Sequence, residues 1–302
     1  MKKTLKNRKT AVDKKPKSGN ILKICLCALL CLITLCSCTL QFGLDDGKSE
    51  SQKDLKVHFI DVGQGDSIFV ELPNGQNMLI DAGEKEYKTK VESYIKDCGY
   101  SKIDFLVASH PHSDHISGLA HIVDSFDINN VYMPKVSHNT KTFEKLLQAI
   151  SDKGLKIKNA VAGENMLKED NLSMDIIGPV EIDEEELNNS SAVIKLTYGE
   201  TSFLFLGDAE KEELNSIKAD MSATVLKVAH HGSKTSTYTE FLNKVRPSVA
   251  VISVNDENSY NHPNKDVVKM LEQSGAKLYR TDFDGTVVVT SNAEKVSVET
   301  EK

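Results

Sequence analysis

Apolar and polar residues alternate in short blocks along most of the chain. In the first half the apolar blocks are rich in Val, Ile and Phe, and turn-forming residues such as the Pro-Asn-Gly-Gln of residues 73–76 separate them. Short β-branched and aromatic blocks between turns are typical of strands, and longer amphipathic segments are typical of helices. The pattern predicts strands at 56–61, 67–72, 77–81 and 103–108 and helices at 88–98 and 115–124.

The second half of the chain repeats this alternation with different residues. Its pattern predicts strands at 191–198, 201–206, 224–229, 249–254, 277–280, 285–290 and 295–298 and helices at 238–245 and 264–274. Strands and helices that alternate in two successive halves indicate an α/β protein. We therefore expect residues 54–302 to form a single domain built as a four-layer αββα sandwich.

The first 38 residues have a different composition. Basic residues precede an apolar run at 24–35, which is short for a membrane span but suits the core of a signal peptide. The run ends in Leu-Cys-Ser-Cys, which resembles a bacterial lipobox with Cys38 as the lipid-modified residue. We expect a lipoprotein-type signal peptide at 1–38, a flexible tether at 39–53, and an extracytoplasmic protein anchored to the bacterial cell membrane. An uncleaved anchor and simple secretion are the alternatives.

Charge is distributed unevenly along the chain. The net charge is −7, but the first 38 residues carry +8 and the remainder carries −15. Because affinity for nucleic acid depends on Lys and Arg displacing counterions, an acidic body excludes broad non-specific binding to DNA. A DNA substrate needs a local basic face, for which the candidates are Lys227, Lys234, Lys244 and Arg246. If that face is acidic or blocked, a small phosphoester is the better substrate class.

Cysteine chemistry does not hold the expected domain together. Five of the six cysteines lie in the first 38 residues, which leaves only Cys98 in the body of the protein. One cysteine cannot form an internal disulfide, so we expect Cys98 to be a buried, small apolar residue.

The stretch SHPHSDHISG at residues 109–118 places three of the nine histidines and one aspartate within six positions. It directly follows the strand expected at 103–108. Imidazole and carboxylate groups are the ligands that zinc, iron and manganese accept in water-activating sites. His110 and His112 can face one metal ion, while Asp114 and His115 can face a second. A purely structural role is the alternative, but four such groups rarely converge at one strand end.

Two other expected strands also end in ligand types. The strand at 201–206 is followed by Gly-Asp-Ala-Glu with Asp208, and the strand at 224–229 by His230 and His231. Asp208 alone would suit a helix N-cap, because helix-forming residues follow it. With the HxHxDH cluster, these strand ends resemble those of the metallo-β-lactamase superfamily. The segments FIDVGQGDS, LIDAG, NNSSAVIKL, FLFLGDAE, AHHGSKTS and NHP resemble, in that order, the soluble hydrolase domain of ComEC-type competence proteins over residues 55–290.

The resemblance implies a site for two divalent metal ions, zinc with manganese as the alternative, that share a hydroxide. It places His110 and His112 on metal one and Asp114 and His115 on metal two, with Asp208 as the bridge. A histidine from positions 230–231 completes metal two, and His230 is favoured because it directly ends the strand. Further expected roles are catalysis for Asp114 and His262, support of the ligands for Asp81 and Asp66, support or substrate contact for His231, and anion contact for Ser233 and Lys234.

One ligand that the resemblance implies is missing. Many superfamily members have a third histidine on metal one, placed between the HxHxDH cluster and the bridging aspartate. Only His121 and His138 occur in that interval, and neither follows a strand just ahead of Asn188, where the ligand is expected. Metal one would then be under-coordinated and more open to substrate oxygens.

These features favour a metal-dependent hydrolase of phosphodiesters, such as a ComEC-like nuclease, with DNA as a candidate substrate. Hydrolysis of a β-lactam or another carboxyl derivative is the alternative enzyme activity. It is weaker because metal one lacks its third histidine and no cysteine follows the cluster as a ligand of metal two. Non-catalytic binding of DNA or of a cell-wall polymer by a lipoprotein is the alternative of a different class.

Overall fold

The computed structural model describes residues 53–302 of the chain. The expected signal peptide, its lipidated Cys38 and nearly all of the expected tether lie outside the described residues, so these expectations stay predictions. Within residues 53–302, no helix combines the length and the apolar character needed to cross a membrane.

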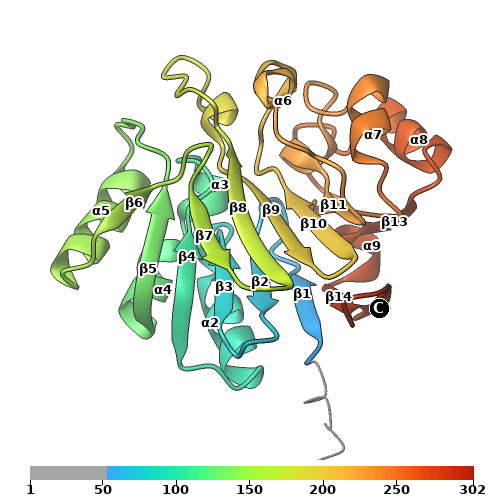
Figure 1. The fold of residues 1–302 in the computed structure, drawn as a ribbon. Coiled ribbons are helices and arrows are strands. Elements are labelled where there is room, and N and C mark those ends of the chain that lie inside the picture. Colours follow the sequence, from blue (N-terminus) through green and yellow to red (C-terminus); the bar gives the residue numbers. More distant parts are fainter. Residues whose placement is uncertain (1–52) are drawn as a thin grey trace, which may run out of the picture. The chain divides into compact units, whose positions relative to one another are not determined.

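The first sheet contains eight strands in the order β15-β14-β1-β2-β3-β4-β5-β6 (Figure 1). The first three strands pair antiparallel in sequence order, as their apolar blocks and turns predict, and β3 to β6 run parallel. The strands are β1 (Leu55–Phe59), β2 (Ile68–Glu71), β3 (Asn77–Ile80), β4 (Lys102–Val107), β5 (Asp127–Met133), β6 (Ile157–Asn159), β14 (Val287–Ser291) and β15 (Val296–Thr300).

The second sheet contains seven strands in the order β13-β12-β11-β10-β9-β8-β7. Strands β10 to β13 are parallel, so their carboxyl ends meet at one edge, whereas β7 to β10 are joined as antiparallel neighbours. The strands are β7 (Asn165–Lys168), β8 (Leu172–Gly178), β9 (Val193–Tyr198), β10 (Thr201–Phe205), β11 (Val225–Lys227), β12 (Val249–Ile252) and β13 (Lys277–Arg280).

The two sheets pack face to face, and helices cover their outer faces, which confirms the expected αββα sandwich. The inner faces share one apolar cluster, in which the rings of Phe59 and Phe205 lie 6.4 Å apart. A second cluster lies under α2, α4 and α5, and a third under α6, α7 and α8. The helices are η1 (Lys85–Tyr87), α2 (Lys88–Asp97), α3 (Ser113–Ile116), α4 (Leu119–Ser125), α5 (Lys141–Asp152), η2 (Leu187–Ser190), α6 (Lys211–Ser216), η3 (Ala229–Gly232), α7 (Thr239–Val245), α8 (Lys265–Gln273) and α9 (Thr281–Asp284).

Three features of the fold were not part of the expected pattern. The helix expected at 115–124 is divided into α3 and α4 next to Gly118, where an added Cβ atom would come within 2.3 Å of the carbonyl oxygen of Ala82. Strands β14 and β15, the last two along the chain, join the first sheet, because β14 pairs with β1. Residues 134–190, for which the pattern predicted no element, contain α5, β6, β7, β8 and η2.

Candidate metal centre

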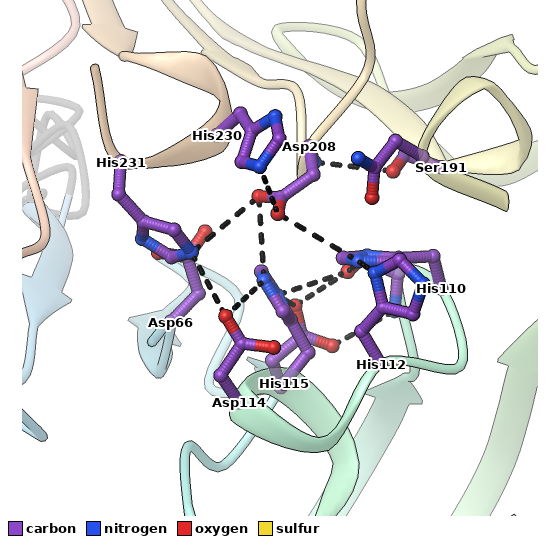
Figure 2. A network of polar contacts seen from close by, with 12 residues as sticks. Asp66, His110, His112, Asp114, His115, Ser191, Asp208, His230 and His231 are labelled. Carbon is purple, nitrogen blue, oxygen red and sulfur yellow. Dashed lines mark hydrogen bonds and ion pairs between the residues drawn. The ribbon is translucent and has the colours of Figure 1, made fainter. Parts of the chain in front are cut away.

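The candidate ligands meet where the strands β4, β10 and β11 end. The HxHxDH cluster follows β4 and continues into α3, Asp208 follows β10, and the histidine pair lies in η3 after β11. A backbone hydrogen bond joins two of these segments: the N–H of His230 donates to the carbonyl of Gly207 at 3.1 Å. The N–H of Ala192, just before β9, donates to the carbonyl of Ser109 at 2.8 Å and so joins the start of the HxHxDH loop to the second sheet. Figure 2 shows the side chains converging on Asp208 from these separate elements.

Four of these side chains form a compact group. Asp114, His115, Asp208 and His231 each offer one ligand atom, and these atoms lie within 4.8 Å of one another. The Nε2 of His115 lies 3.3 Å from Oδ1 of Asp208, and the Nε2 of His231 lies 3.3 Å from Oδ2 of Asp114. Both Nε2 atoms and Oδ1 of Asp208 are buried without a hydrogen-bond partner among the described residues. Because such unpaired atoms are costly, the group needs a further partner at its centre.

The opposite nitrogens of these two histidines are already engaged. Nδ1 of His115 lies 2.9 Å from Oδ2 of Asp81, and Nδ1 of His231 lies 2.9 Å from the carbonyl oxygen of Ser253. In the neutral rings each Nδ1 then donates its proton, which leaves a lone pair on Nε2. A lone pair beside a carboxylate is unfavourable unless a cation lies between them. The donor set therefore fits a divalent metal ion.

The charges of the group also favour a cation. Burial lowers the pKa of His115, but the carboxylates of Asp208 and Asp114 outweigh burial and hold this pKa well above its ordinary value. Burial raises the pKa of Asp208, but His115 and His231 outweigh it and hold this pKa well below its ordinary value. The oxygens thus stay negative and favour a positive partner, either a proton or a metal ion.

His110 and His112 lie beside the other oxygen of Asp208. The Nε2 of His110 is 3.2 Å from Nδ1 of His112 and 3.7 Å from Oδ2 of Asp208. Burial, together with His115, lowers the pKa of His110 well below its ordinary value, which keeps the ring neutral. Asp208 therefore turns one oxygen to each set of histidines, as expected of a bridging ligand. It does not cap a helix, because the N-cap of α6 is Glu210.

The histidine pair after β11 differs from the expectation. His231, and not His230, completes the compact group with Asp114 and His115, and it is only 1% exposed. His230 turns its Nε2 to the other oxygen of Asp208, Oδ2, at 3.7 Å. The preference for His230 assumed an extended strand end. Both histidines instead have left-handed backbones, with φ of 49° and 50°, so the chain coils and both rings face the centre.

Asp81 and Asp66, which were expected to support the ligands, lie directly behind the centre. Asp81 accepts hydrogen bonds from the N–H of Ser109 at 2.8 Å and from its hydroxyl at 2.6 Å, so it holds the start of the HxHxDH loop. Oδ1 of Asp66 lies 3.6 Å from Nδ1 of His231 and 2.8 Å from Nζ of Lys227. Lys227 is fully buried, so it does not belong to the basic face proposed for it.

The remaining candidates divide between the cleft above the centre and its surroundings. His262 lines this cleft, and its ring lies 5.4 Å from that of His230. Burial, followed by the nearby His230 and His231, lowers the pKa of His262 to about 4, so this ring is neutral at pH 7. Ser233 is buried and Lys234 is exposed, and neither lines the cleft.

The cleft has a volume of about 390 Å³. Among residues 53–302 no Lys or Arg lines it, so within this part of the chain the positive charge for an anionic substrate has to come from bound cations and imidazoles. Tyr260 lines the rim of the cleft and is 65% exposed. In the sequence, only its position two residues before His262 indicates that it could lie near the site. The lining residues to which sequence reasoning gave no role are Gln64, Ser113, His138, Thr140, Thr142, Asn188 and Tyr260.

Two helix-covered sheets with a His/Asp cluster at their shared strand ends define the metallo-β-lactamase type of fold, and such a cluster could hold metal ions. The family model of the metallo-beta-lactamase superfamily matches residues 60–254, and the chain belongs to this superfamily. Among solved structures, CmlA, a diiron β-hydroxylase from Streptomyces venezuelae, gives a TM-score of 0.53 at 13% identity over 80% of this chain and 54% of that chain. That likeness shows the fold alone.

Curated relatives bear out the narrower resemblance. ComE operon protein 3 of Bacillus subtilis is 32% identical over 252 residues, and Competence protein ComA of Neisseria gonorrhoeae is 27% identical over 243 residues. The alignments cover 77% and 78% of this chain but 32% of each relative, so the chain spans about a third of the length of these relatives. The similarity to ComEC-type competence proteins is thus confirmed, whereas the individual ligand assignments stay predictions.

Proposed function

We propose that the protein is a metal-dependent phosphodiester hydrolase and that DNA is its substrate. One observation carries the proposal: the two oxygens of Asp208 face two different sets of nitrogen ligands, represented by His110 and His115. A site of this form suits two cations that share a bridging carboxylate. Paired cations suit in-line displacement at phosphorus, because they offset charge on both the attacking and the leaving oxygen.

The residues present fit such a pair of ions. Two divalent cations, zinc with manganese as the alternative, would supply Lewis acidity and acidify water at the centre. Asp114 and Asp208 both line the cleft, and Asp114 is the more exposed carboxylate, with 25% of its side chain exposed against 3% for Asp208, so it can accept the proton of an attacking water. The residues that would hold the ions are His110, His112 and Asp208 on one side and Asp114, His115, Asp208 and His231 on the other.

His262 is placed to handle a phosphate oxygen. Its Nδ1 is buried and has no hydrogen-bond partner among the described residues, so the ring has free hydrogen-bonding capacity. At neutral pH the ring can donate its one N–H to a phosphate oxygen. A phosphate anion beside the ring would raise the pKa of His262, and the ring could then pass a proton to the leaving oxygen.

The choice of DNA rests on two supports. The relatives named ComE operon protein 3 and Competence protein ComA align with most of this chain. Tyr260 offers an exposed ring at the rim of the cleft, on which a nucleobase can stack. The expected basic face keeps Lys234, Lys244 and Arg246 exposed but loses Lys227 to the core. Contacts to the DNA backbone would therefore be few and local.

An extracytoplasmic position at the cell membrane is part of the same proposal. It is supported by the basic and apolar leader that ends in Leu-Cys-Ser-Cys, with Cys38 as the residue that would carry the lipid. A site in that position meets extracellular DNA and the phosphodiesters of cell-surface polymers. Two separate tests apply. The identity of the substrate tests the proposed activity, and lipid modification of Cys38 tests the proposed position at the membrane.

The test of function is a substrate panel with metal content measured on the same preparation. The panel contains single- and double-stranded DNA, a cyclic dinucleotide, a choline phosphoester and a β-lactam. We expect DNA cleavage that Asp208→Asn reduces at least about 100-fold, since the bridge between the ions is lost. Asp124→Asn, at an exposed position of α4, is the matched control and should leave the rate unchanged. Turnover of the β-lactam alone, or DNA binding without cleavage, would replace the proposal with one of its alternatives.

A further inference from the structure

We propose that His230 is the third nitrogen ligand of the metal position held by His110 and His112. The inference deepens the proposed metal site and rests on it. The Nε2 of His230 and the Nε2 of His110 both lie 3.7 Å from the same oxygen of Asp208, Oδ2. Neither distance is that of a hydrogen bond. Both are close to the spacing of roughly 3.3 Å between two ligands of a tetrahedral zinc ion, since zinc–nitrogen bonds are about 2.0–2.1 Å long.

The other nitrogen of His230 faces a carboxylate. Its Nδ1 is buried without a hydrogen bond and lies 3.2 Å from Oε1 of Glu210. That oxygen is itself held, because it accepts hydrogen bonds from the hydroxyl of Thr235 at 3.0 Å and from the amide of Asn188 at 3.4 Å. Histidines that bind metals usually turn their second nitrogen to a carboxylate or carbonyl in this way. The negative charge of Glu210 thus favours a proton on Nδ1, which leaves Nε2 free for an ion.

The backbone after β11 explains why two neighbouring histidines can serve two ions. Successive side chains of an extended strand point to opposite faces. His230 and His231 both adopt left-handed φ values, 49° and 50°, which non-glycine residues rarely do, and both rings turn to Asp208. His231 approaches Oδ1 of Asp208, and His230 approaches Oδ2, each at 3.7 Å. The two rings therefore lie on the two sides of the bridging carboxylate.

The other two histidines considered for this position have different contacts. His121 lies on α4 with its Nε2 2.6 Å from Oε2 of Glu92. His138 packs its ring against Phe143 and lies 6.1 Å, centroid to centroid, from His112. His230 thus supplies, from the turn after β11, the third nitrogen ligand that the sequence lacks between the HxHxDH cluster and Asp208. The ring is 22% exposed in the cleft, so this ion would still be reachable by substrate.

The experiment compares His230→Asn with His138→Asn in the purified full-length chain. Asparagine tolerates a left-handed backbone, so the turn should survive the first change. Elemental mass spectrometry gives the zinc and manganese content per chain, and chelator competition gives the dissociation constant of each ion. We also record the absorption spectrum of the cobalt-loaded protein. We expect two ions in the unchanged protein and in His138→Asn. His230→Asn should keep one ion and bind the other more weakly. Loss of a residue that only supports a ligand already weakens metal binding by about 10- to 100-fold, so loss of the ligand itself should weaken it at least as much.

Two further variants make the outcome decisive. His230→Asp restores a ligand type at the same position and should recover part of the lost affinity, and Glu210→Gln should weaken the same ion by about 10- to 100-fold. Two ions at unchanged affinities in His230→Asn, or loss of the ion in His138→Asn instead, would overturn the inference. If the unchanged protein binds two ions but cleaves no phosphodiester, the proposed function fails and the inference about His230 stands. Circular dichroism confirms that each variant is folded before its metal content is compared.

Discussion

Oδ2 of Asp81 lies 2.9 Å from Nδ1 of His115, and both side chains are fully buried. The same carboxylate holds the backbone N–H and the hydroxyl of Ser109 at the start of the HxHxDH loop. Asp81 directly follows β3, and the HxHxDH loop follows β4. These two strands are parallel neighbours in the first sheet. One buried carboxylate therefore fixes both the ring orientation of a candidate ligand and the position of the loop that carries it.

Asp81→Asn should weaken metal binding by about 10- to 100-fold, because the amide no longer enforces a proton on Nδ1 of His115. Asparagine keeps the size of the side chain and tolerates the left-handed φ of 58° at this position. The measurement is chelator competition. Asp104→Asn is the matched control, since Asp104 is buried and hydrogen-bonded near the opposite end of β4. Equal loss of metal affinity in both variants would show that Asp81 acts only through stability.

The location of the site could be predicted from the sequence because ligand types follow three apolar strands. His110, His115 and Asp208 meet as the strand ends required. The atoms that face one another could not be predicted, because they depend on the left-handed turn at residues 230–231. Lys227 was assigned to the surface as a charged residue. Its burial is offset by a hydrogen bond to the carbonyl of Val228 and by the carboxylate of Asp66, which comes from another part of the chain. Such pairing between distant segments leaves no local pattern.

The same limit explains the errors in the fold. The αββα layers could be predicted because strands and helices alternate in both halves. The order along the chain did not indicate which sheet β14 and β15 join, because the pairing of β14 with β1 depends on a contact between residues more than 200 positions apart, such as Leu55 and Ser291. The break between α3 and α4 depends on the carbonyl of Ala82, which approaches Gly118 from another segment.

Lys227→Met should destabilise the protein by about 3–5 kcal/mol, because it leaves the buried carboxylate of Asp66 without its partner. The free energy of unfolding is measured in urea on protein stripped of metal. The double variant Asp66→Asn with Lys227→Met removes both charges and should recover much of this loss. A single variant that loses less than about 1 kcal/mol would show that water or another cation already compensates Asp66.

Gly65→Ala should disrupt the metal centre. The φ of Gly65 is 142°, and an added Cβ would lie 2.2 Å from the carbonyl oxygen of Asp114, so the ligand loop has to move. Gly75→Ala is the control, because Gly75 also has a positive φ, 86°, but an added Cβ would meet no atom of the described residues within 4 Å. We expect metal affinity to fall in the first variant and to stay unchanged in the second. Equal affinities in both would mean that the loop accommodates the methyl group.

Cys98 should react slowly with thiol reagents in the folded protein. Burial, followed by the charge of Glu71, raises the pKa of its thiol to about 11. The thiolate is the reactive form, so at pH 8 only about one thiol in a thousand is reactive, and the rate should rise about tenfold per pH unit until about pH 11. Alkylation of the peptide that contains Cys98 is followed by mass spectrometry, which separates it from the leader cysteines. A rate equal to that of the guanidinium-unfolded chain would contradict this expectation.

Tyr260 should discriminate substrates that carry nucleobases. Asn258 accepts hydrogen bonds from the N–H groups of Tyr260, at 3.1 Å, and His262, at 3.0 Å, and the two rings stack 5.8 Å apart at 24°. Stacking on an aromatic ring stabilises a bound base by about 1–3 kcal/mol, so Tyr260→Ala should lower kcat/KM for oligothymidylate by about 5- to 150-fold. An abasic oligonucleotide of equal length should be cleaved at the same rate by both proteins, and Tyr260→Phe should keep the preference. In metal-free protein, binding should quench the fluorescence of a 2-aminopurine base in the oligonucleotide. This quenching should persist in Tyr260→Phe and be lost in Tyr260→Ala. Equal effects on the two oligonucleotides would instead assign Tyr260 to holding His262 in place.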